Sequence, residues 1–186
     1  MVAVQRMEPA VYERMASDPA WKLTELHDGI PREKPVMSQA HGGLMMALTR
    51  AVLPGLDDRL HRLRTNHAKL AAPGGSCFIP DLVVLPLPAH SSTPDAADLY
   101  HDPALLGIEI RSPSTGGFDL ETNLPAYMLR GDAEIWLVLP ERAEIVRWLR
   151  ARDGGYAEDR IRAGVLHPAA LPGVAVDLDA LFGRRG

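Results

Sequence analysis

Short runs of branched and apolar residues recur along the chain, separated by turn residues, and they predict a β-sheet. Four such runs occupy residues 64–71, 78–85, 106–111 and 134–139. Shorter apolar runs flank an Asp-Gly turn within residues 23–31 and another within residues 145–161. Because Asp-Gly between two strand-like runs favours a two-residue turn, each pair predicts a hairpin. The pattern therefore predicts a mixed sheet with a hairpin towards each end of the chain.

Apolar residues at helical spacing predict helices between these strands. A short helix is expected over residues 7–18, and another over residues 119–129, which contain Pro125. The longest periodic stretch runs from Leu44 to Leu63, follows Ser38 as an N-cap, and is kinked or divided at Pro54-Gly55. Residues 86–103, rich in Pro, Ser, Asp and Ala, predict an exposed insertion, and residues 171–182 form an apolar tail. The sequence predicts one α/β domain over residues 1–186, with its core at about 20–182 and its sheet flanked by helices.

The composition narrows the classes of function. A chain of 186 residues with 46% hydrophobic residues can bury a sizeable core. Its single cysteine, Cys77, excludes an internal disulfide framework and suits a reducing compartment. We expect a cytoplasmic protein with no membrane partner, because no signal peptide and no apolar run of about 18 residues is present. The net charge of −4 argues against a broadly basic nucleic-acid-binding surface, although local arginine clusters could provide one.

Acidic residues within the strand-like runs are the first candidates for chemistry. Asp81 and Glu109 each lie in or beside a run of branched apolar residues. An ionised carboxylate is costly there unless it is paired or binds a metal, so acids on neighbouring strands could share one divalent cation. Glu25, in the first hairpin, is a third such acid, and oxygen ligands suit Mg²⁺. The alternative is that these acids are exposed at strand edges or paired with arginine. We favour the metal site for Asp81 and Glu109, and both interpretations stay open for Glu25.

Two basic residues accompany these acids. Arg111 lies two residues after Glu109, on the same strand face, where it could hold a phosphate group or neutralise Glu109. His41 lies in the predicted first turn of the long helix, where it could donate a hydrogen bond, contact a substrate, or serve in capping or packing, which we favour. The other histidines lack the spacing of zinc ligands, and nothing in the sequence places a base beside Ser112 or Ser114.

A series of short motifs runs in order through most of the chain. They are Glu25 with Asp28-Gly29, His41, Pro80-Asp81-Leu82, Ile108-Glu109-Ile110 followed by Ser112-Pro113-Ser114-Thr115, Asp119 with Tyr127, residues 133–138, residues 171–174 and Leu181-Phe182. Together they resemble the Uma2 family of restriction endonuclease-like proteins, which have the PD-(D/E)XK nuclease fold. The resemblance implies a restriction-endonuclease-like mixed sheet, binding of Mg²⁺ or Mn²⁺, and hydrolysis of phosphodiester bonds in nucleic acid. We expect DNA as the substrate and a homodimer as the assembly.

The resemblance also implies a set of metal ligands. Asp81 and Glu109 match the metal-binding acids of the family, and Glu25 matches an additional upstream acid. Ile110 would lend its backbone carbonyl, and Glu25 would contact the metal through water.

One family feature differs in this sequence. The lysine that family members commonly carry on the helix after the glutamate strand is replaced by Asn123, and the position two after the glutamate holds Arg111. Lys22, Lys34 and Lys69, the three lysines of the chain, fall in neither position. We therefore expect Arg111 to hold phosphate, Asn123 to orient a water or substrate oxygen, and cleavage to be weak. The alternative is a degenerate member that binds nucleic acid or a protein partner without cleavage.

Overall fold

The computed structural model describes residues 6–87, 99–111 and 118–184, with side chains for all but 118–122. The main sheet forms the centre of this part of the chain. Among these residues it has six strands, in the order β11 (Tyr156–Ile161), β10 (Glu144–Arg150), β9 (Glu134–Leu139), β8 (Leu106–Ile110), β6 (Leu82–Pro86) and β3 (His61–Thr65). Strands β8 and β9 are parallel, whereas β6 and β8 are antiparallel. The sheet is therefore mixed, as the sequence predicts.

A second sheet is built around the N-terminal hairpin. Its described strands have the order β2 (Ile30–Glu33), β1 (Thr24–His27), β5 (Ser76–Phe78), β4 (Lys69–Ala72) and β7 (Leu99–Tyr100). The hairpin turns at Asp28 and Gly29, whose φ angles of 49° and 80° are both positive, as a type I′ turn requires. A short third pairing joins β12 (Val165–Leu166) to β13 (Val176–Asp177). The predicted N-terminal hairpin is confirmed.

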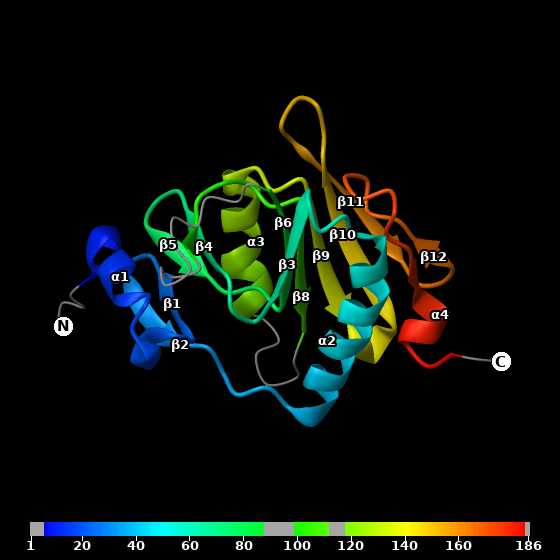
Figure 1. Ribbon diagram of the computed structural model, residues 1–186, viewed down its shortest axis with the longest axis horizontal. Coiled ribbons are helices and arrows are strands. Elements are labelled where there is room, and N and C mark those ends of the chain that lie inside the picture. The colour runs from blue at the N-terminus through cyan, green and yellow to red at the C-terminus, as the bar shows by residue number, and fades with distance from the viewer. Residues whose placement is uncertain (1–5, 88–98, 112–117, 185–186) are drawn as a thin grey trace.

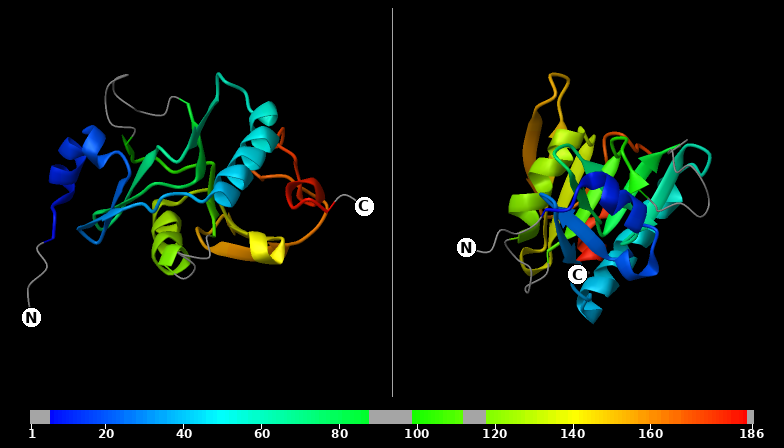
Figure 2. Two further views of the ribbon diagram at one scale, coloured as in Figure 1. Left: turned by 90° about the horizontal axis from the view of Figure 1, so that it is seen from below. Right: turned by 90° about the vertical axis from the view of Figure 1, so that its left-hand side faces the viewer.

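Two helices cover opposite faces of the main sheet (Figures 1 and 2). Helix α2 (Gln39–Val52) buries Leu48 and Val52 against the even-numbered positions of β8, in a core that also includes α4 (Leu178–Leu181). Helix α3 (Phe118–Arg130) packs Ala126 and Tyr127 against the other face. Helix α1 (Pro9–Met15) packs separately on the second sheet through Tyr12. Because strand side chains alternate between faces, odd-numbered positions of β8 point towards α3.

The N-cap of the long helix is confirmed, but its end is not. Ser38 Oγ accepts a hydrogen bond from the His41 N–H at 3.2 Å, and α2 then ends at Val52, followed by a 3₁₀ turn over Leu53–Gly55. The predicted continuation to Leu63 is wrong, because residues 61–65 form β3 at the edge of the main sheet. The proline and glycine in the 3₁₀ turn end the helix rather than kink it.

Two other predicted segments also differ from the structure. The strand expected over residues 64–71 is two strands, β3 and β4, separated at Asn66, which has a φ of 46°. The predicted exposed insertion, residues 86–103, contains β7, in which Tyr100 is buried against the α3 side of the core; its residues 88–98 lie outside the described residues. The apolar tail forms β13 and α4. Both differences arise because pairing with a distant strand determines the local structure.

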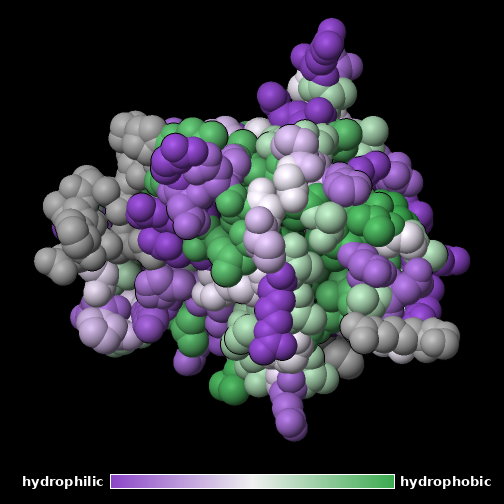
Figure 3. Space-filling view, turned by 45° about the vertical axis from the view of Figure 1, so that its right-hand side comes forward, coloured by the Kyte–Doolittle hydropathy of each residue, from purple (hydrophilic) through white to green (hydrophobic). Residues whose placement is uncertain are grey.

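The C-terminal hairpin of β10 and β11 is confirmed and projects from the body of the molecule (Figure 1). Its tip is hydrophilic (Figure 3). Within the described residues, no helix is both long and apolar enough to cross a membrane.

A buried ion pair joins α3 to the second sheet. The side chains of Arg130 and Asp132 are fully buried, with Arg130 Nε 3.3 Å from Asp132 Oδ1. The Arg130 guanidinium also donates to the backbone carbonyls of Ala71 and Tyr100, in β4 and β7. Asp132 accepts a hydrogen bond from the Ala104 N–H at 2.7 Å. The pair therefore holds the second sheet against the helix that carries part of the site described below.

Replacing Arg130 by methionine should lower the free energy of unfolding by about 3–5 kcal/mol, because Asp132 would be left as a buried charge without its partner. Urea denaturation followed by circular dichroism measures this change. Arg59→Met is the matched control, since Arg59 pairs with Asp57 at the surface and is 88% exposed; it should leave the midpoint unchanged. If the Arg130 variant and the unaltered protein unfolded at the same midpoint concentration of urea, the structural role of the pair would be contradicted.

Candidate active site

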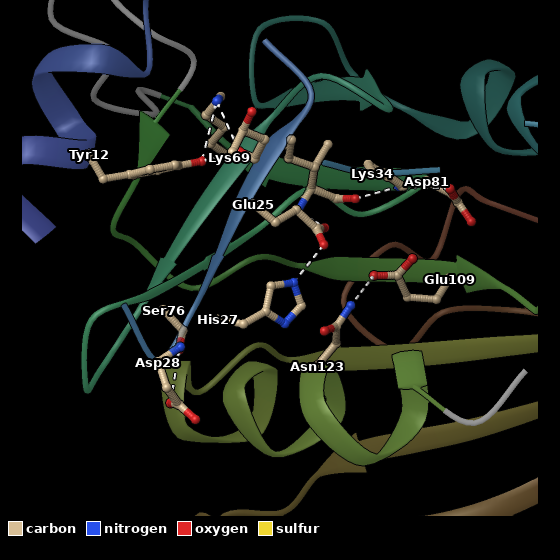
Figure 4. A network of polar contacts seen from close by, with 12 residues as sticks. Tyr12, Glu25, His27, Asp28, Lys34, Lys69, Ser76, Asp81, Glu109 and Asn123 are labelled. Carbon is tan, nitrogen blue, oxygen red and sulfur yellow. Dashed lines mark hydrogen bonds and ion pairs between the residues drawn. The ribbon is translucent and has the colours of Figure 1, made fainter. Parts of the chain in front are cut away.

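Asp81 and Glu109 lie side by side on the face of the main sheet that α3 covers. The antiparallel register of β6 and β8 places Leu82 opposite Ile108. Continuing that register by one residue places Asp81 opposite Glu109, and residues directly opposite in such a pair have Cβ atoms about 4.5–5.5 Å apart. Figure 4 shows the two carboxyl groups approaching the same region. The structure thus brings together the two acids that the sequence singled out.

Asp81 is almost completely buried, at 1% exposed, and its carboxylate is surrounded by donors. Oδ1 lies 2.9 Å from Lys34 Nζ and 3.1 Å from His41 Nε2, and Oδ2 accepts a hydrogen bond from the Ile110 N–H at 2.8 Å. Burial alone would raise the pKa of Asp81, but the Lys34 ammonium, His41 and the Ile110 N–H together hold it below its ordinary value. Asp81 is therefore ionised at neutral pH.

Glu109 has the opposite electrostatic character. Its Oε1 accepts a hydrogen bond from the Tyr127 hydroxyl at 2.6 Å and lies 3.5 Å from Asn123 Nδ2. Burial raises the pKa of Glu109 to about 8; the Asp81 carboxylate raises it too, and the Lys34 ammonium opposes both. Asn123 and Tyr127 reach the same carboxyl group because residues four apart lie on one helix face. In the absence of a metal ion, Glu109 therefore keeps a proton at neutral pH.

Glu25 supports the segment that leads into Asp81. Its Oε1 accepts a hydrogen bond from the Ile79 N–H at 2.8 Å, and its Oε2 lies 2.9 Å from His27 Nε2. The carbonyl of the same residue, Ile79, accepts a hydrogen bond from Lys34 Nζ at 2.6 Å. Side chains from the N-terminal hairpin region thus hold both the N–H and the carbonyl of Ile79, two residues before Asp81. The water-mediated metal contact expected for Glu25 stays a prediction.

Sequence reasoning missed two residues of this site, Lys34 and Tyr127. The two sequence positions where the family keeps its lysine hold Asn123 and Arg111, but Lys34, directly after β2, reaches Asp81 across 47 positions of the chain. Burial would lower the pKa of Lys34, but Asp81, Glu109 and Glu25 raise it above its ordinary value. Spacing from Asn123 could have indicated Tyr127. No local pattern could have indicated Lys34, because its contact depends on how the two sheets pack.

The contacts of Arg111 and His41 decide between some of their sequence-based interpretations. Arg111 Nη1 lies 3.4 Å from Glu141 Oε1, and both side chains are partly exposed, so Arg111 pairs with Glu141 rather than neutralising Glu109. Its predicted contact with phosphate stays a prediction. The His41 side chain contacts Asp81, which favours a role in the site over capping or packing; its backbone N–H is the group that Ser38 caps. The motif at residues 112–115 lies outside the described residues.

The oxygen atoms of the acid pair and its surroundings are suitable ligands for a hard divalent cation. When both are ionised, the two carboxylates have about eight acceptor positions between them, and hydrogen bonds from the described residues use two at Asp81 and two at Glu109. The carbonyl of Ile110 points to the same strand edge as its N–H, which donates to Asp81. The described residues contain no cluster of three or more His, Cys, Asp or Glu side chains that could hold an ion. Two carboxylates and a carbonyl with several waters are nevertheless sufficient for Mg²⁺.

The proton on Glu109 predicts a specific pH dependence of stability. Because the folded protein raises the pKa of this group from 4.5 to about 8, the stability that the bound proton contributes is present below pH 4.5 and is lost as the pH rises towards 8. Relative to Glu109→Gln, the free energy of unfolding of the unaltered protein should therefore fall between pH 5 and 8, by at most about 1.4 kcal/mol per pH unit.

Denaturation in urea with EDTA, repeated at several pH values, measures this difference. Glu141→Gln is the control, because Glu141 is an exposed acid whose replacement should not change the slope. A difference between the Glu109 variant and the unaltered protein that stays constant from pH 5 to 8 would contradict the protonated carboxyl group.

Comparison with known proteins identifies a solved structure of similar fold and the family of this chain. No curated protein matches the sequence. Among solved structures, the chain matches a crystal structure described as "a putative nuclease belonging to DUF820" from Anabaena variabilis ATCC 29413, with a TM-score of 0.69 and 16% identity, over 86% of this chain and 89% of that one. This similarity confirms the predicted fold class. The family model Uma2, described as "Putative restriction endonuclease", matches residues 9–179. The chain therefore belongs to the Uma2 family.

Proposed function

We propose that this protein is a metal-dependent endonuclease that hydrolyses phosphodiester bonds of nucleic acid, with DNA as its substrate. The observation that carries the proposal is the cross-strand pair of Asp81 and Glu109, two acids brought together on one face of a sheet beneath a helix. Such a pair is electrostatically costly, and a bound cation would compensate that cost. Membership of the Uma2 family supports the same reaction class.

The metal would be Mg²⁺ or Mn²⁺, held by Asp81, Glu109 and the backbone carbonyl of Ile110, with Glu25 behind a water molecule. Uma2 membership supports a divalent cation, and the all-oxygen donor set favours a hard one. When bound, such a cation would polarise a phosphoryl oxygen and stabilise the negative charge that develops there.

The side chains of the site would supply orientation. In hydrolysis, a water oxygen bonds to phosphorus, the bond from phosphorus to one ester oxygen breaks, one proton leaves the water and another reaches the departing oxygen. Tyr127 and Asn123 fix the carboxyl group of Glu109, and the Asn123 amide would orient a water or a substrate oxygen. His41, through its contact with Asp81, would fix that carboxylate next to the substrate. Arg111, partly exposed beside Glu141, would hold a phosphate group.

A second candidate is a protein of this fold that binds nucleic acid without cleaving it. The neutral amide of Asn123, at the position where family members commonly carry lysine, favours this alternative. The predicted homodimer stays a prediction for either candidate, and analytical ultracentrifugation tests it.

Cleavage assays on supercoiled, linear and single-stranded DNA and on RNA, each with Mg²⁺, Mn²⁺ or EDTA, test the proposal. We expect cleavage of DNA that requires the metal and that Asp81→Asn reduces by roughly 10²–10³-fold, the usual effect of removing one preorganised stabilising group. Asp153→Asn, in the exposed turn of the β10–β11 hairpin, is the matched control and should cleave normally. Cleavage that persists in EDTA or in Asp81→Asn would contradict the proposed site, whereas binding without cleavage would favour the second candidate.

A further inference from the structure

Lys34 is buried at the acid pair. Its side chain is 14% exposed although it belongs to the connection between β2 and α2, where lysine is ordinarily solvated. Nζ donates to the Ile79 carbonyl at 2.6 Å and to Asp81 Oδ1 at 2.9 Å. An ammonium group has three N–H donors, so two of them have partners in the part of the chain that the structure describes. One donor is left for a water molecule or a substrate oxygen.

Lys34 and Asn123 approach the acid pair from different elements. Asn123, on α3, contacts Glu109 with a neutral amide, whereas Lys34, from the end of the hairpin, contacts Asp81 with a full positive charge (Figure 4). The acidic groups that face this ammonium are Asp81, Glu109 and Glu25. Both Lys34 and His41 bring a basic side chain into contact with Asp81.

We propose that Lys34 supplies, from the N-terminal hairpin, the ammonium group that Asn123 does not provide from the helix. On this proposal, which rests on the nuclease function proposed above, the remaining N–H of Lys34 contacts either an oxygen of the scissile phosphate or the attacking water. A compact ammonium can stabilise negative charge on a phosphoryl oxygen and orient a water, whereas an amide offers only a neutral dipole. The native protein is then a competent nuclease rather than a weakened one.

A purely structural role for Lys34 makes a different prediction. If Lys34 only anchors the Ile79 carbonyl and balances Asp81, then a neutral donor of similar length would replace it without loss of cleavage. Lys34→Gln keeps an N–H donor and removes the charge, so it separates the two roles. Lys34→Met removes both, and Lys22→Met is the matched control because Lys22 is exposed.

The experiment measures single-turnover cleavage of duplex DNA at saturating Mg²⁺, Mg²⁺ affinity by calorimetry, and the thermal midpoint of each variant. We expect Lys34→Gln to cleave roughly 10²–10³-fold more slowly than the unaltered protein. Its Mg²⁺ affinity should be equal or higher, because a positive charge beside Asp81 has been removed. Its thermal midpoint should stay above the assay temperature. Lys34→Met should cleave as slowly as Lys34→Gln, and Lys22→Met should cleave normally.

Cleavage by Lys34→Gln within threefold of the unaltered rate would overturn the proposal and leave Lys34 as an anchor. A loss of Mg²⁺ binding in Lys34→Gln that matches its loss of rate would also overturn it. Failure of the unaltered protein to cleave any nucleic acid would instead overturn the nuclease function itself, and this inference with it. The two failures are thus distinguishable.

Discussion

The electrostatic cost of placing two carboxyl groups opposite each other on buried strands governs the rest of this site. The register of β6 and β8 fixes Asp81 beside Glu109, and neither group can ionise without affecting the other. The repulsion between the two carboxyl groups is avoided because their protonation states differ. Asp81 keeps its charge beside Lys34 and His41, whereas Glu109 keeps its proton and accepts from Tyr127. A divalent cation would relieve the same repulsion and allow both groups to ionise.

The site is completed by parts of the chain that belong to different sheets. The acids lie at the main sheet, but the backbone N–H and carbonyl of Ile79 are held by Glu25 and Lys34, which lie in and directly after the N-terminal hairpin of the second sheet. The buried pair of Arg130 and Asp132 fastens that sheet to α3, the helix that carries Tyr127. Packing of the second sheet therefore determines where Asp81 lies relative to the Lys34 ammonium. This dependence explains why a short hairpin contributes charged residues to a site on another sheet.

Much of this arrangement could be predicted from the sequence, and the failures have a common cause. Apolar runs located β8, which carries Glu109, and the helix of Asn123, because these signals are local. The strand expected over residues 78–85 is instead divided between β5, which ends at Phe78, and β6, which begins at Leu82 directly after Asp81. The helix expected to reach Leu63 ends early, because residues 61–65 pair with β6 as strand β3. The helical spacing of Leu60 and Leu63 does not reveal this pairing. Lys34 lies in neither sequence position where the family keeps its lysine, so its spacing gives no sign of a role in the site. Its position in space follows from tertiary packing, which spacing along the chain does not encode.

The central claim is that Asp81 and Glu109 form one binding site for a divalent cation. A crystal structure of the protein soaked with Mn²⁺, with anomalous scattering recorded at the manganese edge, tests this most directly. We expect one anomalous peak in contact with a carboxylate oxygen of each acid, and its absence in crystals of Asp81→Asn. Saturating Mn²⁺ with no peak between the two acids, or with a peak bound only elsewhere, would contradict it.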